Sequence, residues 1–393
     1  MTSLLSFVDL PMPEQKARGL FFTAREIAQQ PDTWLKTLQI FKQNQQRISS
    51  FLESIGLQGQ LENRPVVMLV GAGTSDYIGH ALALLLRQKW GCEVSACAST
   101  ELLPNLDQYV VAGRRYLWIS FSRSGDSPEA VAVVEQAIKL HPSIAHLVIT
   151  CNEQARLITV CKEAKHACAI VLDDEVNDRS LAMTSSFTNM VLMGQCLAHA
   201  WSIEEYSVIL ERLIRAGQEF LPQAEKEAER LSSLTPPRAC MVGTGSLASV
   251  AKESALKVLE MTAGQMSTMS ETILGLRHGP MAALDAKTLF LCFVSGDERK
   301  TNYAADLLRE VGEKEITAER IAVGPVSARE KIAPYCESYL SVDDGIDDVY
   351  RTVVDVIFGQ LLGFYCSVAR GLKPDSPSPG GVINRVVEKF RIY

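Results

Sequence analysis

Apolar runs with the length of buried strands alternate along this chain with segments whose apolar residues recur at helical spacing. Strands are expected at residues 65–70, 114–122, 146–152 and 166–172, and helices at 80–90, 130–140 and 181–201. Short apolar strands that alternate with helices are typical of a parallel sheet with helices on both faces.

The alternation starts again after residue 234. A charged helix at 204–233 and a Pro-rich linker precede a second series, with strands expected at 239–246, 288–296, 316–324 and 337–343, and helices at 253–264, 302–311 and 347–370. The motif GAGTS at residue 71 and GTGS at residue 243 each follow a strand and precede a helix. The repetition predicts two similar α/β halves, at 61–203 and 204–372.

The two ends of the chain lack the strand–helix alternation of these halves. Residues 1–60 are expected to form a helical arm that packs or dimerises. Within it, Thr23 and Glu26 have capping-box spacing, a short helix at 24–30 would end at Pro31, and Asp32 would cap the next helix. The tail 373–393 is rich in Pro, Ser and Gly and is expected to wrap across a surface without forming an element.

Composition excludes several classes of protein. The net charge of −7 and the lack of a dense Lys/Arg block argue against nucleic-acid binding. The apolar runs are too short to span a membrane, and the first residues do not have the pattern of a secretory signal. The ten cysteines include no C-x-x-C pair, so we expect reduced thiols in a cytoplasmic protein.

Two hydroxyl-rich turns are the candidates for phosphate binding. Ser122, Ser124 and Ser127 lie between a strand and a helix, with Ser127 at the N-cap and Pro128 at the first helical position. Serines here could simply cap a turn. The loop Gly73–Ser75 would add Thr74 and Ser75 as donors at the same sheet edge, however, and two such loops favour a phosphate ester. GAGTSDYIG lacks the spacing of a dinucleotide loop and the lysine of a P-loop.

A second group of residues has the chemistry for moving protons. Lys257 and Glu260 lie three residues apart on a helix, and His278 follows in a loop bounded by Gly279 and Pro280. A carboxylate on an otherwise apolar helix is a candidate general base, because burial weakens an acid and strengthens its conjugate base. The simpler alternatives are an ion pair and a core histidine. The other histidines have no metal-ligand partners at sensible spacing, so no metal site is assigned.

Together these motifs resemble the sugar isomerase (SIS) domain family, which includes the isomerase half of glucosamine-6-phosphate synthase. The phosphate signature SxSGxS/T is present as Ser122–Ser127, and the K-x-x-E … HGP pattern as Lys257, Glu260 and His278. Nearly the whole chain is closer still to the bacterial tagatose-6-phosphate ketose/aldose isomerase group, whose members are also described as galactosamine-6-phosphate deaminases. Residues 178–190, QQPDTW near the start and NRVVEKF in the tail carry that similarity.

The resemblance implies two SIS domains, each a flavodoxin-like or Rossmann-like three-layer α/β sandwich, in a homodimer. It implies that Glu260 moves a proton between sugar carbons 1 and 2, that Lys257 positions it, and that His278 opens the sugar ring from the neighbouring subunit. The tail lysine that closes over the sugar in the synthase is matched here by Arg385. Met183, Thr184 and Ser185 replace the synthase's S-T-K segment.

The expected reaction is deamination of galactosamine 6-phosphate to tagatose 6-phosphate and ammonia, without a cofactor. The glutaminase part of the synthase has no counterpart here, so the deaminating direction is expected. A glucosamine-6-phosphate deaminase or a plain ketose/aldose isomerase would use the same residues. A phosphosugar sensor is the non-enzymatic alternative, although a sensor would not need Glu260 and His278 together.

Overall fold

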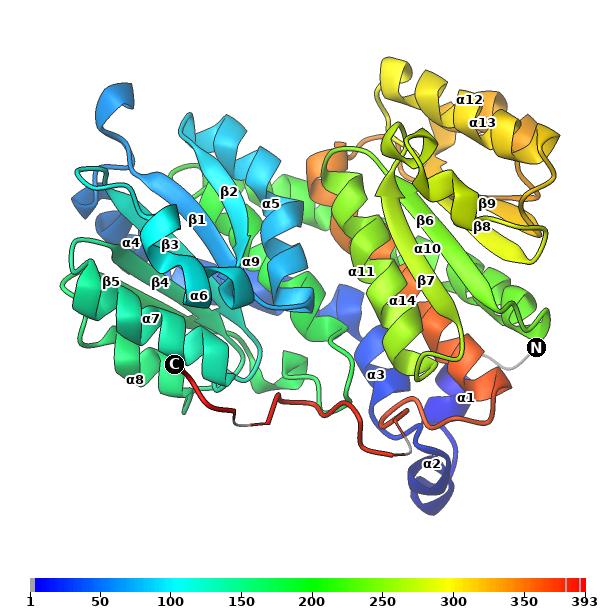
Figure 1. Ribbon diagram of the computed structural model, residues 1–393, viewed down its shortest axis with the longest axis horizontal. Coiled ribbons are helices and arrows are strands. Elements are labelled where there is room, and N and C mark those ends of the chain that lie inside the picture. The colour runs from blue at the N-terminus through cyan, green and yellow to red at the C-terminus, as the bar shows by residue number, and fades with distance from the viewer. Residues whose placement is uncertain (1–3, 379, 389) are drawn as a thin grey trace. The chain divides into compact units, whose positions relative to one another are not determined.

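The computed structural model describes residues 4–378, 380–388 and 390–393, and its chain divides into two compact units. One comprises residues 32–178, 185–210 and 383–393 and is called here the first-sheet unit. The other comprises residues 1–31, 179–184 and 211–382 and is called the second-sheet unit. Each contains one five-stranded parallel sheet covered by helices on both faces, so the predicted α/β fold class is confirmed (Figure 1).

The sheet of the first unit has the strand order β2-β1-β3-β4-β5. Its strands are β1 (Val66–Gly71), β2 (Val94–Ala98), β3 (Tyr116–Ser122), β4 (Ala145–Thr150) and β5 (Ala167–Val171). All four pairings are parallel. The three central strands are buried along their whole length, as their continuous apolar sequences predict.

Helices cover both faces of this sheet. Helices α6 (Ser99–Tyr109), α7 (Pro128–Leu140) and α8 (Arg156–Cys161) bury apolar side chains on one face, against Met68, Trp118 and Val148 among others. Helices α5 (Thr74–Trp90) and α9 (Ser185–Ala198) pack on each other, and Gly194 of α9 leaves room for Leu82 of α5. Two 3₁₀ turns, η1 (Leu61–Asn63) and η2 (Asp174–Val176), complete the unit.

The sheet of the second unit has the order β10-β9-β8-β6-β7 and is parallel throughout. Its strands are β6 (Arg238–Gly243), β7 (Ser267–Thr272), β8 (Thr288–Phe293), β9 (Glu319–Pro325) and β10 (Ser338–Val342). Read from β7, this is the order of the first sheet. Gly73 and Gly245, which precede the helices that follow β1 and β6, also share one backbone conformation, with φ of 56° and 64°. The predicted repeat is therefore present in the structure.

Helix α11 (Ser246–Met261) lies on one face of the second sheet and packs on α14 (Asp348–Ala369). Helix α12 (Glu298–Glu313) and the short α13 (Arg329–Ile332) cover the other face. Helix α10 (Ile203–Ser233) begins in the first unit and continues into the second. The remaining short turns are η3 (Gly275–Arg277), η4 (Pro280–Ala283), η5 (Val326–Ala328) and η6 (Ala333–Tyr335).

The N-terminal residues are helical as predicted, in α1 (Leu4–Val8), α2 (Met12–Arg18), α3 (Thr23–Ala28) and α4 (Gln30–Ser54). The predicted capping box is wrong, because Thr23 Oγ1 donates to Asp375 and the Glu26 carboxylate accepts from the backbone of Arg179 and Ser180. The predicted Asp32 cap is also wrong. Helix α4 already begins at Gln30, and Pro31 lies in its first turn instead of ending a helix.

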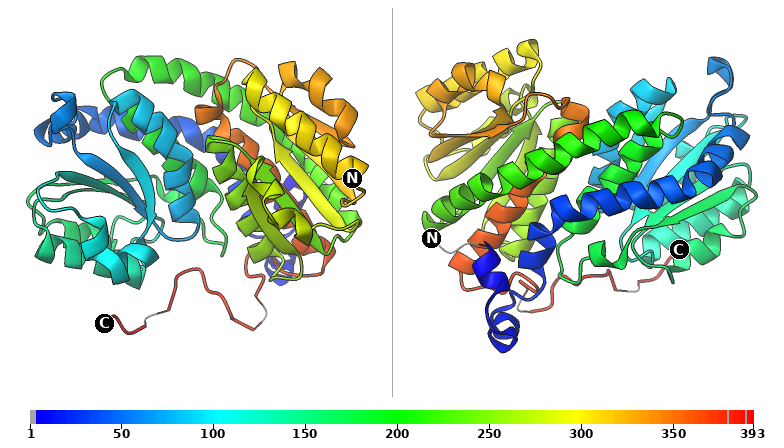
Figure 2. Two further views of the ribbon diagram at one scale, coloured as in Figure 1. Left: turned by 45° about the horizontal axis from the view of Figure 1, so that its top comes forward. Right: turned by 180° about the vertical axis from the view of Figure 1, so that it is seen from behind.

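Helix α14 is long and apolar enough to cross a membrane by length and composition, which the sequence prediction did not anticipate. However, 89% of its most apolar window is buried within the protein, as in a core helix. Beyond α14 the described residues form no further helix or strand (Figure 2). Residues up to 382 belong to the second-sheet unit, and those from 383 to the first-sheet unit.

Candidate active site

The loops with the predicted phosphate-binding residues meet at one edge of the first sheet. Strands β1 and β3 are parallel neighbours, and the order β2-β1-β3 reverses direction between them. Such a switch point opens a crevice at the carboxyl ends of the strands, where ligands of open α/β sheets bind. Loop 72–75 leaves β1 and loop 122–127 leaves β3 at this position.

Hydrogen bonds inside loop 122–127 orient the hydroxyls of Ser122 and Ser124. Ser122 Oγ accepts from Gly125 N at 3.0 Å, and Ser124 Oγ accepts from Asp126 N at 3.3 Å. A hydroxyl that accepts a bond from an amide still has its own proton to donate. Both serines are therefore oriented by the backbone and are able to donate to an anion.

The loop is also anchored from outside. Asn152 Nδ2 donates to Ser124 O at 2.8 Å, and Asp126 Oδ1 accepts from Arg156 N at 2.9 Å. Gly125 has a φ of +66°, and a Cβ at this position would lie 2.3 Å from the Cβ of Ala155. Glycine is required here on both grounds.

The remaining predicted phosphate ligands lie at two helix N-termini. Thr74 and Ser75 are buried in the first turn of α5, after the exposed Gly73. Ser127 is the N-cap residue of α7, as predicted, but its side chain makes no capping hydrogen bond. The positive ends of the two helix dipoles thus face the same switch point.

Arg385 lies in the same unit, at the carboxyl edge of this sheet. Its Nε donates to Asp178 O and its terminal Nη2 to Asn177 Oδ1, both at 2.8 Å. The guanidinium thus anchors the C-terminal segment, and its predicted contact with the sugar stays a prediction. Burial, with the Asp178 carboxylate adding to it, raises the pKa of the nearby Cys151 thiol, which Arg123 and Arg385 oppose.

The candidate proton-transfer residues lie on α11 of the second-sheet unit. Lys257 Nζ is 2.5 Å from Glu260 Oε2 and 3.4 Å from Glu253 Oε1. The Lys257 and Glu253 side chains are buried, whereas Glu260 keeps 23% of its exposure. A buried cation thus holds a carboxylate that still reaches solvent, and this arrangement suits a base that acts on a ligand.

The segment that contains His278 packs on the other face of the second sheet from α11. Helix α11 lies on the face where Thr268 of β7 donates to Ala255 O at 2.8 Å. Leu276 and Leu284, on either side of His278, pack on the opposite face, against Cys240, Phe290 and residues of α12. His278 is exposed, and its imidazole makes no hydrogen bond or ion pair with any residue that the structure describes.

The second repeat contains a loop that corresponds to the serine loop. Ser295-Gly296-Asp297 follows β8 as Ser124-Gly125-Asp126 follows β3, and Asp297 N donates to Ser295 Oγ as Asp126 N does to Ser124 Oγ. In this second loop the Asp348 carboxylate accepts from the Ser295 hydroxyl and, at 3.0 Å, from Gly296 N. In the second loop the serine hydroxyl and the glycine amide thus bind an internal anion, whereas in the first loop the Gly125 amide donates to Ser122 Oγ.

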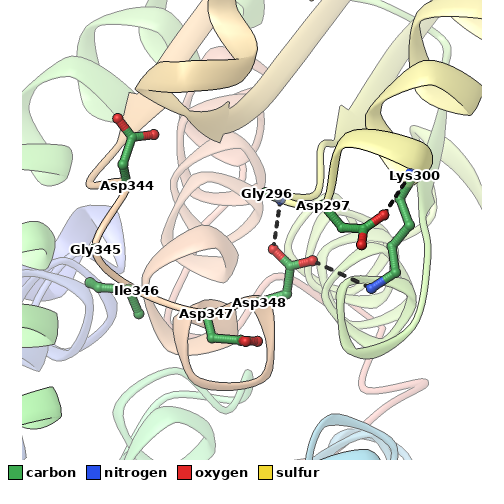
Figure 3. A pocket seen from close by; sticks show the side chains of 8 residues that line it. All are labelled: Gly296, Asp297, Lys300, Asp344, Gly345, Ile346, Asp347 and Asp348. Carbon is green, nitrogen blue, oxygen red and sulfur yellow. Dashed lines mark hydrogen bonds and ion pairs between the residues drawn. The ribbon is translucent and has the colours of Figure 1, made fainter.

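A polar cavity of about 490 Å³ lies beside this second loop (Figure 3). Its lining residues include Asp297, Lys300, Asp344, Asp347 and Asp348. Four carboxylates make it unsuited to a phosphate ester. Among the described residues no group of three or more His, Cys, Asp or Glu side chains could hold a metal ion.

Comparisons with known proteins agree with these observations. The model of the SIS domain matches residues 60–200. D-galactosamine-6-phosphate deaminase AgaS of Shewanella sp. (strain ANA-3) is 33% identical over 378 residues, 95% of this chain and 92% of that protein. The AgaS protein of Escherichia coli O157:H7 is 33% identical over 382 residues, 97% of each chain. This chain belongs to the SIS-domain family.

Its structure agrees with the same assignment. The crystal structure of tagatose-6-phosphate ketose/aldose isomerase from Escherichia coli superposes with a TM-score of 0.81 at 31% identity, covering 92% of this chain and 95% of that one. The sequence resemblance to the SIS family and to its isomerase and deaminase group is thereby confirmed. The fold places the phosphate-loop residues together in one unit and Lys257 with Glu260 in the other.

Three residues of these sites were not predicted. Glu253 lies one helical turn before Lys257, a spacing that the sequence does show. Arg123 lies inside the serine loop, where its side chain is buried. Asp178 caps α9, since its carboxylate accepts from Ser185 N at 3.1 Å and from Ser186 N at 2.9 Å. The predicted helix 181–201 starts only at Ser185 for this reason.

Proposed function

We propose that this protein converts galactosamine 6-phosphate and water to tagatose 6-phosphate and ammonia. The observation that carries the proposal is the partly exposed Glu260 carboxylate, held 2.5 Å from the buried ammonium of Lys257. The similarity to proteins named galactosamine-6-phosphate deaminase, over almost the full chain, supports this substrate class. A binding protein without turnover would not need a positioned base.

The phosphate ester would bind at the switch point of the first sheet. Ser122 and Ser124 would donate hydroxyl protons, and the N-termini of α5 and α7 would add backbone amides and a favourable dipole. The second repeat supports the role of Ser124, because the hydroxyl of Ser295, at the corresponding position, donates to the carboxylate of Asp348. His278 would then assist opening of the pyranose ring, which exposes the carbon 1 aldehyde.

Glu260 would move the proton that the reaction requires. As a carboxylate it takes the proton from carbon 2, which the carbon 1 carbonyl acidifies, and an enolamine forms between carbons 1 and 2. The carbon 1 oxygen takes a proton from water as the enolamine forms. Glu260 then returns a proton to carbon 1, which becomes a CH₂OH group, and carbon 2 becomes a ketimine as its nitrogen gives a proton back to water. Water adds to that carbon, and the carbinolamine loses ammonia to give the ketose. The substrate's own carbonyl makes the carbon 2 proton acidic, so these reaction steps need no cofactor.

His278 would come from a second copy of the chain. The helix with Glu260 and the segment with His278 pack on opposite faces of the second sheet, which supports a site that takes the two residues from different copies. A two-fold dimer can supply each site with a residue of its partner. The exposed imidazole is consistent with such a role.

A plain ketose/aldose isomerase is the second candidate, because a structure similar over most of the chain is named for that activity. Proton transfer between carbons 1 and 2 is common to both reactions, and they differ in whether carbon 2 carries an amine. A glucosamine-6-phosphate deaminase would differ only in the epimer at carbon 4. The carboxylate of Glu260 would have the same role in each.

Ammonia release by the purified protein distinguishes these activities. Galactosamine 6-phosphate and glucosamine 6-phosphate are supplied separately, and the ketose product is identified by nuclear magnetic resonance. Faster release from the galactosamine ester, with tagatose 6-phosphate as product, is the expected result. Faster release from the glucosamine ester would reassign the substrate. If neither ester gives ammonia while tagatose 6-phosphate equilibrates with an aldose, the isomerase is correct.

A further inference from the structure

The segment that contains His278 is fixed at its two ends by apolar side chains. Leu276 and Leu284 are buried in the core between the second sheet and α12. None of the residues 277–283, all of which the structure describes, is buried. Residues 276–284 are called here the histidine segment. Burial therefore holds the ends of this segment, whereas its middle, where His278 lies, must be held by other contacts.

Polar contacts with α12 hold the middle of the histidine segment. Arg277 Nε donates to Glu310 Oε2 at 2.7 Å, and Lys314 Nζ donates to Glu310 Oε1 at 2.6 Å. Lys314 Nζ also lies 3.5 Å from Met281 Sδ. The carboxylate of Glu310 is thus connected to the histidine segment on both sides of His278, directly through Arg277 and by way of Lys314 to Met281.

Glu310 suits this role because both its position and its charge are fixed. Leu307 and Val311 of the same helix are fully buried, so α12 is a rigid support. The hydrogen bond from Lys314, and to a smaller extent that from Arg277, lower the pKa of the Glu310 carboxyl although burial opposes them. The carboxylate is therefore ionised near neutral pH and attracts both cations.

The backbone on the other side of His278 gives the imidazole little support. Gly279 has a φ of +122°, which side chains disfavour, and a Cβ at this position would meet no atom of the described residues within 4 Å. The imidazole itself makes no hydrogen bond or ion pair with any residue that the structure describes. Its place therefore depends on the backbone of Arg277, whose side chain is held by Glu310.

We propose that Arg277 and Glu310 are positioning residues that hold His278 at the point from which it assists ring opening. The inference rests on the proposed function, because it assigns His278 a part in the reaction. Arg277 directly precedes His278, so a displacement of its backbone also moves the imidazole. A displacement of about 1 Å can lower a rate by about 10²-fold. The pair should therefore affect turnover more than the stability of the whole protein, to which partly exposed ion pairs contribute little.

Arg277→Ala and Glu310→Gln remove this ion pair from either side. The kcat for ammonia release should fall by about tenfold in each, with little change in KM, because the phosphate would bind at the serine loop of the other unit. Arg277→Lys keeps the positive charge and should recover part of the rate. The control is Arg309→Ala. Arg309 precedes Glu310 on α12 and pairs with Asp306 and Glu313 of the same helix, so this variant should behave as the wild type.

The variant His278→Ala separates positioning from a general structural role. If Arg277 acts through His278, Arg277→Ala should have almost no further effect on the residual rate of His278→Ala. A general loss of folded structure would instead lower the rates of both backgrounds by the same factor.

Hydrogen exchange tests the anchor without turnover. The amides of His278 and Ala282 donate to Gly275 O at 2.9 Å and to Gly279 O at 3.0 Å, so their exchange measures opening of the histidine segment. Mass spectrometry of a peptide that covers residues 275–284 should show exchange about fivefold faster in Arg277→Ala and in Glu310→Gln, the upper end of the range for a partly exposed ion pair. The wild type and the Arg309→Ala control should exchange at the same rate.

Three results would overturn the inference. They are unchanged exchange in Arg277→Ala, faster exchange with unchanged kcat, and a loss of kcat of the same size in the His278→Ala background. Ammonia release by the wild type is measured on the same preparations. Faster exchange in the variants of a protein that releases no ammonia would support the anchor and refute the proposed reaction. Ammonia release by the wild type together with any of the three results would refute only the inference.

Discussion

Glu260 and His278 are carried on opposite faces of the same five-stranded sheet. Thr268 marks the face of α11, which carries Glu260, and Leu276 and Leu284 place the segment of His278 on the face of α12. We therefore expect an active site that contains both residues to combine two copies of the chain. The proposed mechanism thus predicts a dimer.

Mixed dimers test this prediction. We expect Glu260→Gln and His278→Ala each to be almost inactive alone. When the two variants are unfolded together and refolded, half of the dimers are mixed, and one of their two sites has both native residues. Ammonia release should then recover to about a quarter of the wild-type rate. No recovery in a sample that contains mixed dimers would show that both residues act from one chain.

Lys257 is expected to affect both stability and activity. It contacts Glu253 and Glu260 from a buried position, so Lys257→Met removes the cation from two carboxylates. The free energy of unfolding should fall by about 3–5 kcal/mol, as when one partner of a buried ion pair is lost. Urea unfolding measures this change.

The double variant Glu253→Gln/Lys257→Met separates the two roles of Lys257. Removing the buried Glu253 charge should recover much of the stability, but ammonia release should stay low because Glu260 is no longer positioned. Recovery of activity together with stability would mean that Lys257 has a structural role only.

The two copies of the serine-glycine-aspartate loop offer a matched pair of variants. Ser124→Ala should raise the KM for the sugar phosphate, and the Ki of inorganic phosphate, by about tenfold with a smaller effect on kcat. Ser295→Ala should leave both constants unchanged, because Asp348 already occupies the second loop. Inhibition kinetics check both variants, and equal effects of the two would contradict the proposed phosphate site.

Much of this architecture is predictable because the central strands are apolar along their whole length. The strands that were missed, β2 and β7, are the edge strands next to β1 and β6, and their residues are mostly only partly buried. Their sequences, VSACA and STMSET, therefore have no continuous apolar run. Helix α6, which follows β2, was missed as well, since Pro104 and a kink at Asn105 interrupt its pattern.

The contacts of the site residues were predictable where they follow from local spacing, and not where the partner is distant in the sequence. Lys257 and Glu260 pair because of helical spacing, which a sequence displays directly. The hydrogen bonds of Thr23 and Glu26 could not be predicted, because their partners Asp375 and Ser180 are far away in the sequence. Arg123 was missed for a similar reason, since only the folded chain brings Arg385 to it.

His146 should make stability depend on pH. Its ring is buried on β4 against Trp118, and burial lowers its pKa to about 4. The unfolded chain takes up a proton below its ordinary pKa of about 6.5, whereas the folded protein does not until about 4. Stability contributed by neutral His146 is thus present above pH 6.5 and is lost as the pH falls to 4, by roughly 3 kcal/mol.

His146→Phe should remove this part of the dependence while keeping a ring against Trp118. His199, whose pKa burial also lowers to about 4, remains in the variant, so a smaller slope should persist. Urea unfolding at pH values between 4 and 7 measures the difference. If the free energy of unfolding depends on pH in the same way in the variant and the wild type, the pH dependence does not come from His146.

The most direct test of the account is the rate of ammonia release from galactosamine 6-phosphate by the wild type and Glu260→Gln. Glutamine keeps the shape of the side chain but cannot accept the carbon 2 proton, so kcat should fall by about 10²–10⁴. The circular dichroism spectrum and the affinity for inorganic phosphate should not change. Full activity of the variant would contradict the proposal that Glu260 transfers the proton.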